Sequence, residues 1–305
     1  MGRTRKGRPI DGVLLLDKDR GASSNRALQQ VKRLFGAAKA GHTGSLDPLA
    51  TGMLPVCLGE ATKVSGFLLD ADKHYRVTAK LGARTDTADA DGVVTETAPV
   101  PVFDDARLRE TLARFTGDIE QVPPMYSALK HQGRRLYELA RAGEAVERPA
   151  RRVRVFSLAL EAREDDSLTL DVRCSKGTYV RTLVEDIAAD LGTLGHVTAL
   201  RRLGVGPYEK RPMFTLAELE ARAETGGQAA LDSCLLPVDS AVADWPVVSL
   251  DADMSFYVRR GQAVQVPGAP TAGRVRLYSE AGDFLGIGEV ADDGRIAPKR
   301  LLATP

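Results

Sequence analysis

The sequence predicts an α+β protein, with a mixed, mainly antiparallel central sheet flanked by helices and a small β-rich domain after it. Helical and strand patterns alternate irregularly, and residues 74–81 alternate apolar with polar side chains, as expected of a strand with one buried face. At 305 residues the chain exceeds the usual size of one domain. We therefore expect two domains, at 1–245 and 246–305.

The first elements follow from local periodicity. Residues 12–16 form a short apolar run that predicts a buried strand. Apolar residues then recur with a helical period over 28–35, behind an expected cap at Ser24 or Asn25. The stretch 41–52, GHTGSLDPLATG, contains three glycines and a proline without periodicity, which predicts a loop.

The middle of the chain is read in the same way. Residues 53–58 return to a strand pattern, and helices are expected at 104–116, 134–142 and 180–191. A capping box formed by Thr215 and Glu218 predicts the start of a further helix.

The character of the sequence changes after residue 237. A linker around Trp245 precedes a short helix that ends at Gly261, and strands are expected at 275–278 and 284–290. This pattern predicts the small β domain.

Composition limits the class of protein. Hydrophobic residues make up 43% and charged residues 27% of the chain, which is ordinary for a globular protein. No apolar stretch approaches the ~20 residues that span a bilayer, and no signal peptide is recognised, so we expect a cytoplasmic protein. Cys57, Cys174 and Cys234 lack the paired spacing of a zinc site and are expected to be thiols. The net charge of +1 neither favours nor excludes nucleic-acid binding, although basic clusters such as Arg201 with Arg202 permit RNA binding.

Five motifs occur in order along the chain: LLLDKDRGASSN, GHTGSLDPLATGMLPVCLGEATK, DKHYRVTAKLGARTDTADADG, VPPMYSALKHQGRRLYELAR and CSKGTYVRTLVEDIA. Together they resemble the successive motifs of bacterial tRNA pseudouridine-55 synthases of the TruB type. The end of the chain, RRGQAVQVPGAP through DGRIAPKRLL, is similar to the small PUA domain that follows the catalytic domain in that family. One departure is Asp19, where the family commonly has proline.

The resemblance implies isomerisation of the T-loop uridine of tRNA to pseudouridine. The bond between N1 and ribose C1′ is cleaved, the uracil rotates, and C5 joins the same carbon, so no redox cofactor, metal or nucleotide is expected. Such a step needs a carboxylate beside C1′, as nucleophile or as stabiliser of an oxocarbenium-like centre. By motif match this carboxylate is Asp47, although an aspartate before a proline in a glycine-rich loop is most often a turn former.

The same resemblance suggests the neighbours of Asp47. Arg181 is expected to pair with Asp47 and hold it ionised, the alternative being a surface arginine at a helix start. Tyr75 is expected to stack on the target base and to transfer a proton. Tyr179 and Leu200 are expected to line the same pocket. For these last three residues the alternative is a place in the core.

RNA contacts are also implied. A uridine in a folded T-loop must leave its stack to reach the carboxylate, and the family suggests His42 as the residue that contacts the disrupted loop. Taken alone, His42 would be a surface histidine. Lys18 and Lys130 are candidates for phosphate contacts. Asp89 is a candidate hydrogen-bonding partner in an active-site loop, because the run TDTADADG lacks the ligands of a calcium loop.

Other functions remain open. A guide-RNA-dependent synthase acting on ribosomal RNA would share similar motifs, and a non-catalytic tRNA-binding folding factor would share the fold. The absence of long basic tails favours a stand-alone monomer that binds the T-arm of tRNA, with no membrane and no obligatory protein partner. A metal-dependent nuclease is disfavoured, because no acidic or histidine cluster has plausible ligand spacing.

Overall fold

An eight-stranded sheet forms the centre of the computed structural model, which describes residues 7–127, 129–144 and 146–303. The strand order is β1-β3-β12-β4-β11-β10-β7, and β2 pairs with β3. The β3–β12 pair is parallel and the other pairs of this sheet are antiparallel. The expected fold class, α+β with a mixed and mainly antiparallel sheet, is confirmed.

The strands of this sheet are β1 Gly12–Lys18, β2 Ala40–His42, β3 Thr51–Leu58, β4 Lys73–Leu81, β7 Gly117–Gln121, β10 Arg151–Glu164, β11 Ser167–Cys174 and β12 Gly195–Val205. The helices are α1 Ser24–Leu34, α2 Ser65–Asp70, α3 Asp105–Arg114, α4 Leu136–Arg141, α5 Val180–Asp190, α6 Leu216–Asp232 and α7 Ala252–Arg259, with short 3-10 turns at Gly59–Lys63, Gly206–Tyr208 and Val238–Val242. Two small hairpins pair β5 Ala83–Thr85 with β6 Val94–Thr97, and β8 Lys130–His131 with β9 Arg134–Arg135.

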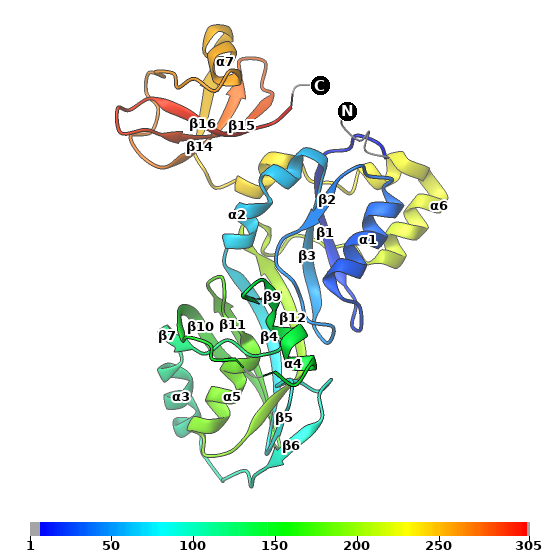
Figure 1. The fold of residues 1–305 in the computed structure, drawn as a ribbon, viewed down its shortest axis with the longest axis vertical. Coiled ribbons are helices and arrows are strands. Elements are labelled where there is room, and N and C mark those ends of the chain that lie inside the picture. Colours follow the sequence, from blue (N-terminus) through cyan, green and yellow to red (C-terminus); the bar gives the residue numbers. More distant parts are fainter. Residues whose placement is uncertain (1–6, 128, 145, 304–305) are drawn as a thin grey trace.

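Strand β4 buries one face, as the alternation over 74–81 predicts, whereas β1 and β3 are buried on both faces. Val77, Ala79 and Leu81 of β4 belong to the main core, which α3 and α5 complete on one side of the sheet (Figure 1). The opposite face carries polar cross-strand pairs, such as Thr78 with Thr169, whose hydroxyl oxygens lie 3.2 Å apart. This asymmetry places the candidate residues of β4 and α5 on the covered side.

Two boundaries near the N-terminus differ from expectation. Ser23, rather than Ser24 or Asn25, caps α1, and its side chain accepts a hydrogen bond from the backbone N–H of Arg26. Ser24 is buried instead and bonds to another loop. The predicted loop 41–52 is shorter, because its ends join β2 and β3 and leave only 43–50 between the strands.

Further along, the expected helices at 104–116 and 180–191 appear as α3 and α5, and the predicted capping box of Thr215 and Glu218 starts α6. The helix predicted at 134–142 is shorter, because Arg134 and Arg135 form β9. The long strands β10, β11 and β12 were not predicted. One reason is that most of β10 is exposed on both faces, so that it shows no clear alternation.

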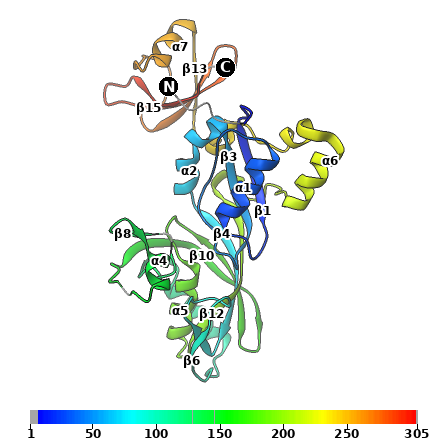
Figure 2. The same ribbon diagram turned by 45° about the vertical axis from the view of Figure 1, so that its right-hand side comes forward.

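A second sheet, ordered β13-β14-β15-β16, forms the C-terminal domain at the end of the elongated molecule (Figures 1 and 2). Its strands are β13 Val247–Leu250, β14 Arg274–Ser279, β15 Phe284–Val290 and β16 Ile296–Leu301. The fully buried Ile287 packs in one cluster with Val13, Leu15 and Met53 of the larger domain. The hydroxyl of Tyr278 donates to Asp239 at 2.5 Å. The two domains therefore share an apolar contact and a polar one.

Two other expectations concern thiols and membranes. Cys57, Cys174 and Cys234 are buried and form no disulfide. Among the helices of the described ranges, none has the length and apolar character required to cross a membrane.

Candidate active site

Asp47 lies in the loop 43–50, which connects β2 to β3 and is held on both sides of the carboxylate. The hydroxyl of Ser24 accepts a hydrogen bond from the backbone N–H of Leu46 at 2.7 Å and donates to its carbonyl at 3.1 Å. On the other side, the ammonium of Lys18 donates a long hydrogen bond of 3.5 Å to the carbonyl of Pro48. Side chains from α1 and β1 therefore fix the position of this loop.

Arg181, in the first turn of α5, brings three segments together. Its Nε lies 2.9 Å from Oδ2 of Asp47. Its two terminal nitrogens donate to the carbonyls of Thr87 and Tyr126, each at 2.7 Å. The Arg181 side chain is 6% exposed and that of Asp47 is 40% exposed, so the carboxylate keeps an open side. The pair expected from the resemblance is thus present in the geometry.

Asp89 adds a second carboxylate to this cluster. Its Oδ2 lies 3.9 Å from Nε of Arg181, and its Oδ1 accepts a hydrogen bond from the Thr87 hydroxyl at 2.7 Å. Burial raises the pKa of Asp47 above its ordinary value, and the charge of Asp89 acts in the same direction. Arg181 and Lys18 oppose both effects. Arg181 is therefore the principal group that favours the ionised form of Asp47.

Tyr75 lies beside this cluster on β4, opposite Arg202 of β12 in the strand register. Burial raises the pKa of its phenol, whereas the charge and the hydrogen bond of Arg202 lower it. The charge of Asp47 also raises the pKa of Tyr75, which indicates that the two groups are close enough to interact.

Tyr179 immediately precedes α5, and Gln121 of β7 holds its backbone. The side-chain oxygen of Gln121 accepts from Tyr179 N at 3.0 Å, and the side-chain nitrogen donates to Tyr179 O at 3.3 Å. Burial raises the pKa of Tyr179, and Asp47 contributes in the same direction. Leu200 is buried at the edge of the main core cluster and is the register partner of Val77.

The three basic residues expected to touch RNA differ in accessibility. Lys18 is 1% exposed, and its Nζ also donates to the carbonyls of Asp19 and Ala22 at 2.8 Å. Burial lowers its pKa to about 8. In this structure Lys18 supports the backbone around Asp47, and its expected phosphate contact stays a prediction. Because only the backbone of Asp19 takes part, the departure from proline leaves the contact between Lys18 and Asp19 intact. His42 is half-buried at the end of β2, and Lys130 is exposed on β8.

Sequence reasoning missed the role of Arg202, which it treated only as part of a basic cluster with Arg201. Adjacent residues of a strand face opposite sides. Arg201 turns outward and pairs with both oxygens of Asp17, at 2.9 and 2.7 Å, while Arg202 is 1% exposed. The sequence carries no signal for which of the two arginines is buried. Ser24 and Gln121 were missed for a similar reason, since their partners are backbone atoms distant in sequence.

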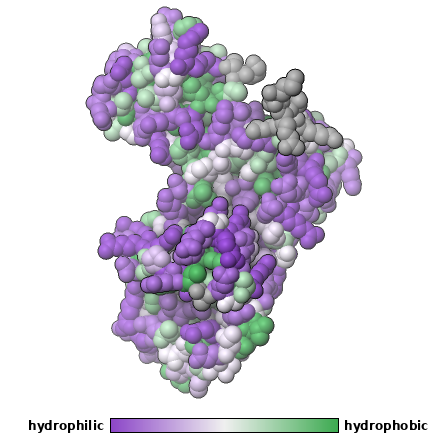
Figure 3. All heavy atoms as spheres, viewed as in Figure 1, coloured by the Kyte–Doolittle hydropathy of each residue, from purple (hydrophilic) through white to green (hydrophobic). Residues whose placement is uncertain are grey.

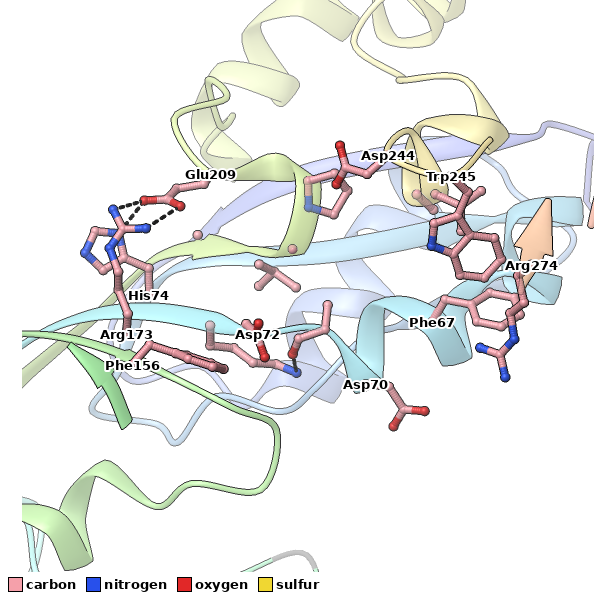
Figure 4. A pocket seen from close by; sticks show the side chains of 18 residues that line it. Phe67, Asp70, Asp72, His74, Phe156, Arg173, Glu209, Asp244, Trp245 and Arg274 are labelled. Carbon is pink, nitrogen blue, oxygen red and sulfur yellow. Dashed lines mark hydrogen bonds and ion pairs between the residues drawn. The ribbon is translucent and has the colours of Figure 1, made fainter. Parts of the chain in front are cut away.

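A cavity of about 600 Å³ lies elsewhere on the larger domain, and Arg274 is its one lining residue from the described part of the C-terminal domain (Figure 4). On one side it is lined by His74, Arg173 and Glu209, which interact with one another, and on the other by Phe67 and Trp245, whose ring centroids are 4.9 Å apart. None of the residues expected to act on the substrate lines it. Within the described residues, no group of three or more His, Cys, Asp or Glu side chains is arranged to hold a metal ion.

Comparison with known proteins supports one family along the chain. Residues 32–180 match the family described as "TruB family pseudouridylate synthase (N terminal domain)". Residues 181–243 match "tRNA pseudouridylate synthase B C-terminal domain", and 246–302 match "Pseudouridine synthase II TruB, C-terminal".

Curated relatives extend the similarity to the full length. A tRNA pseudouridine synthase B of Nitrosococcus oceani is 55% identical over 300 residues, which cover 98% of this chain and 97% of the relative. One of Sodalis glossinidius is 56% identical over 310 residues, covering 100% and 99%.

Two solved structures share the fold. A chain in "Crystal Structure of a Cbf5-Nop10-Gar1 Complex" has a TM-score of 0.73 at 24% identity, covering 96% of this chain and 84% of the other. A chain in "Structure of H/ACA RNP bound to a substrate RNA containing 2'-deoxyuridine" has a TM-score of 0.74 at 21% identity, covering 100% and 92%. With full-length identity above half to its curated relatives, and with the Asp47–Arg181 pair in place, this chain belongs to the TruB family of pseudouridine synthases.

Proposed function

We propose that this enzyme isomerises the uridine at position 55, in the T-loop of tRNA, to pseudouridine. The observation that carries the proposal is the partly open carboxylate of Asp47, fixed by Arg181 in a chain of this family. The curated relatives named as tRNA synthases support tRNA as the substrate class. Their similarity favours this reading over a guide-RNA-dependent enzyme or a non-catalytic folding factor.

In the proposed reaction Asp47 acts beside C1′ of the flipped nucleotide. The N1–C1′ bond breaks, the uracil turns within the pocket, and C5 bonds to C1′. C5 then loses its proton and N1 gains one, so that product and substrate are isomers. A carboxylate at C1′ can attack that carbon or stabilise its positive charge. Tyr75 supplies an aromatic face for the base and a hydroxyl for proton transfer. Tyr179 and Leu200 form the surrounding wall, and Asp89 supports Arg181.

The RNA is proposed to approach across the hydrophilic hollow between the C-terminal domain and the lower half of the molecule (Figure 3). Lys130 and the neighbouring Arg134 and Arg135 are exposed on the β8–β9 hairpin and are suited to phosphate contacts. His42 is proposed to contact the loop from which the uridine has flipped. We assign RNA binding to 246–305 as a PUA-like unit, catalysis to 1–245, and action as a cytoplasmic monomer without a protein partner.

The decisive experiment incubates the purified protein with an unmodified tRNA transcript and maps pseudouridine at single-nucleotide resolution. Modification at one T-loop uridine without any added factor is expected. A minimal T-arm stem-loop should also react, because folded RNA loops are recognised through shape and extruded bases.

Two matched RNAs sharpen the test. A stem-loop with a scrambled loop on the same stem should not react, and equal rates on both loops would overturn the proposed specificity. Modification of a ribosomal RNA only when a guide RNA is present would favour the alternative enzyme. tRNA binding with no modification under any condition would favour the folding factor.

A further inference from the structure

Arg202 is a buried cation at the edge of the proposed active site, and no step proposed above uses it. Its side chain is among the largest that are fully buried, with 1% exposure. Within the described residues, no carboxylate oxygen lies within 4.0 Å of its guanidinium. A buried charge without an ionic partner is costly unless its hydrogen bonds are well satisfied. The hydrogen bonds of Arg202 must therefore offset the free-energy cost of burying its charge.

The partners of Arg202 lie on the strands and the loop that frame the proposed site. Its Nε donates to the carbonyl of Met53 at 2.6 Å, on β3. Its Nη2 donates to the carbonyl of Gly44 at 3.0 Å, three residues before Asp47 in the loop 43–50. Across the sheet it faces Tyr75, its register partner on β4. One planar group thus joins the loop of the proposed carboxylate to β3, from a position opposite the proposed aromatic platform on β4.

The backbone of Arg202 is closely packed against β3. Gly52 is the register partner of Arg202 on β3 and has φ +95°. A Cβ built on Gly52 would lie 2.2 Å from the carbonyl oxygen of Arg202. The close approach of β3 and β12 therefore holds the base of the Arg202 side chain in place while its guanidinium reaches across to the loop.

Arg202 and Tyr75 are register partners on neighbouring strands, and burial raises the pKa of the Tyr75 phenol, whereas the positive charge of Arg202 lowers it. At 1% exposure, Arg202 is too enclosed to contact an RNA phosphate directly. Its effect on the reaction must therefore pass through the residues that it holds.

We propose that Arg202 is a positioning residue for the isomerisation: by bonding Gly44 and Met53 from the position opposite Tyr75, it sets the spacing between the Asp47 loop and the Tyr75 hydroxyl. The inference rests on the proposed function. A misplacement of about 1 Å at a reacting group can lower a rate about 100-fold, so one planar tether is sufficient to matter. The requirement is for the forked geometry of arginine and not only for its charge.

The test compares Arg202→Met and Arg202→Lys with the parent, using a T-arm stem-loop. Single-turnover rates at saturating enzyme and equilibrium RNA binding are measured on the same preparations. We expect both variants to lose about 100-fold in rate while the dissociation constant changes by no more than about threefold. Arg201→Met is the matched control: it makes the same change one residue away on the opposite face of β12, and it should keep the parental rate.

A double-mutant cycle with Tyr75→Phe separates positioning from general support of the fold. If Arg202 acts through the Tyr75 hydroxyl, its removal should cost less than about threefold once that hydroxyl is gone. These slow reactions are followed over days with enzyme in excess. If Arg202→Met proves unfolded by thermal melting, the cycle is run with Arg202→Lys, which keeps the buried charge but lacks the planar fork that bonds both carbonyls.

The outcomes are distinct. A rate close to that of the parent, a loss confined to binding, or an equal loss in the presence and absence of the Tyr75 hydroxyl would overturn the inference. A parent enzyme that leaves the T-loop uridine unmodified would instead overturn the proposed function.

Discussion

Nε of Arg181 lies 2.9 Å from Oδ2 of Asp47, and the same guanidinium donates to the carbonyls of Thr87 and Tyr126. One buried residue therefore sets both the charge and the place of the proposed catalytic carboxylate. Because burial alone raises the pKa of Asp47, the ionised form depends on this contact.

Asp47→Asn should abolish turnover and leave RNA binding nearly unchanged, because it removes the charge while almost preserving the shape. Loss of an essential catalytic side chain can cost about four orders of magnitude or more in rate. Single-turnover rate and affinity are measured on one preparation, with the exposed Asp19→Asn as control. A rate within a few-fold of the parent would exclude Asp47 from the mechanism.

Arg181→Met should shift the acid limb of the pH–rate profile to higher pH. Arg181 lowers the pKa of Asp47, so its removal raises that pKa further and a higher pH is needed to ionise the carboxylate. The rate should fall about 100- to 1000-fold near neutral pH, as for other losses of charge stabilisation. Arg109→Met, an exposed change on α3, serves as control. An acid limb that stays in place would show that Arg181 does not govern the ionisation of Asp47.

Two substitutions of Tyr75 distinguish stacking from proton transfer. Tyr75→Phe should keep RNA affinity and lose about 100-fold or more in rate if the hydroxyl transfers a proton. Tyr75→Leu should in addition weaken binding, since stacking on an aromatic side chain is worth about 1–3 kcal/mol per base. Full activity of the phenylalanine variant would reduce Tyr75 to a platform for the base.

Local chemistry predicted those parts of the fold whose cause is local. The capping box of Thr215 and the alternation of β4 depend on neighbouring residues, and both are present. The strands β10 to β12 depend on partners distant in sequence, and β10 shows few buried positions that could reveal a pattern. The expected cap of α1, Ser24 or Asn25, was wrong: Ser23 caps the helix, and Ser24 bonds to Leu46, a partner that no local pattern shows.

The candidate site shows the same contrast between features that local motifs indicate and features that depend on distant segments. The motifs indicated Asp47 and Arg181, which the fold brings into contact. They did not indicate that Lys18 would be enclosed by backbone carbonyls, nor which of two adjacent arginines would be buried. Burial of a long polar side chain depends on how β1, β3 and β12 meet, which the sequence of any one strand does not contain.

Truncation after Asp244 should destabilise the remaining domain. The cut removes Ile287, which is fully buried against strands of the larger domain, and Trp245, which packs on Phe67. Re-exposing this apolar surface should lower the melting temperature by about 5 °C or more. Calorimetry of parent and truncated proteins measures the effect. An unchanged melting temperature would mean that the domains are thermodynamically independent, and that loss of RNA binding on truncation reports contacts alone.

A point substitution tests the RNA grip of the C-terminal domain without uncovering that interface. Three basic residues lie near the end of this domain: Arg295 pairs with Asp293 and Lys299 with Glu289, whereas the exposed Arg300 donates to a backbone carbonyl. Arg300 can therefore contact a phosphate without first breaking an ion pair with a carboxylate. Arg300→Glu should weaken binding of full-length tRNA and reduce the slope of log affinity against log salt by about one or two counterions. The chemical step at saturating RNA should be unaffected, because the proposed catalytic residues all lie in the larger domain.

Arg109→Glu on α3, at the far end of the molecule (Figure 1), makes the same charge change away from this domain and controls for net charge. If both variants alter affinity and salt slope equally, the effect is one of overall charge and Arg300 does not contact the RNA.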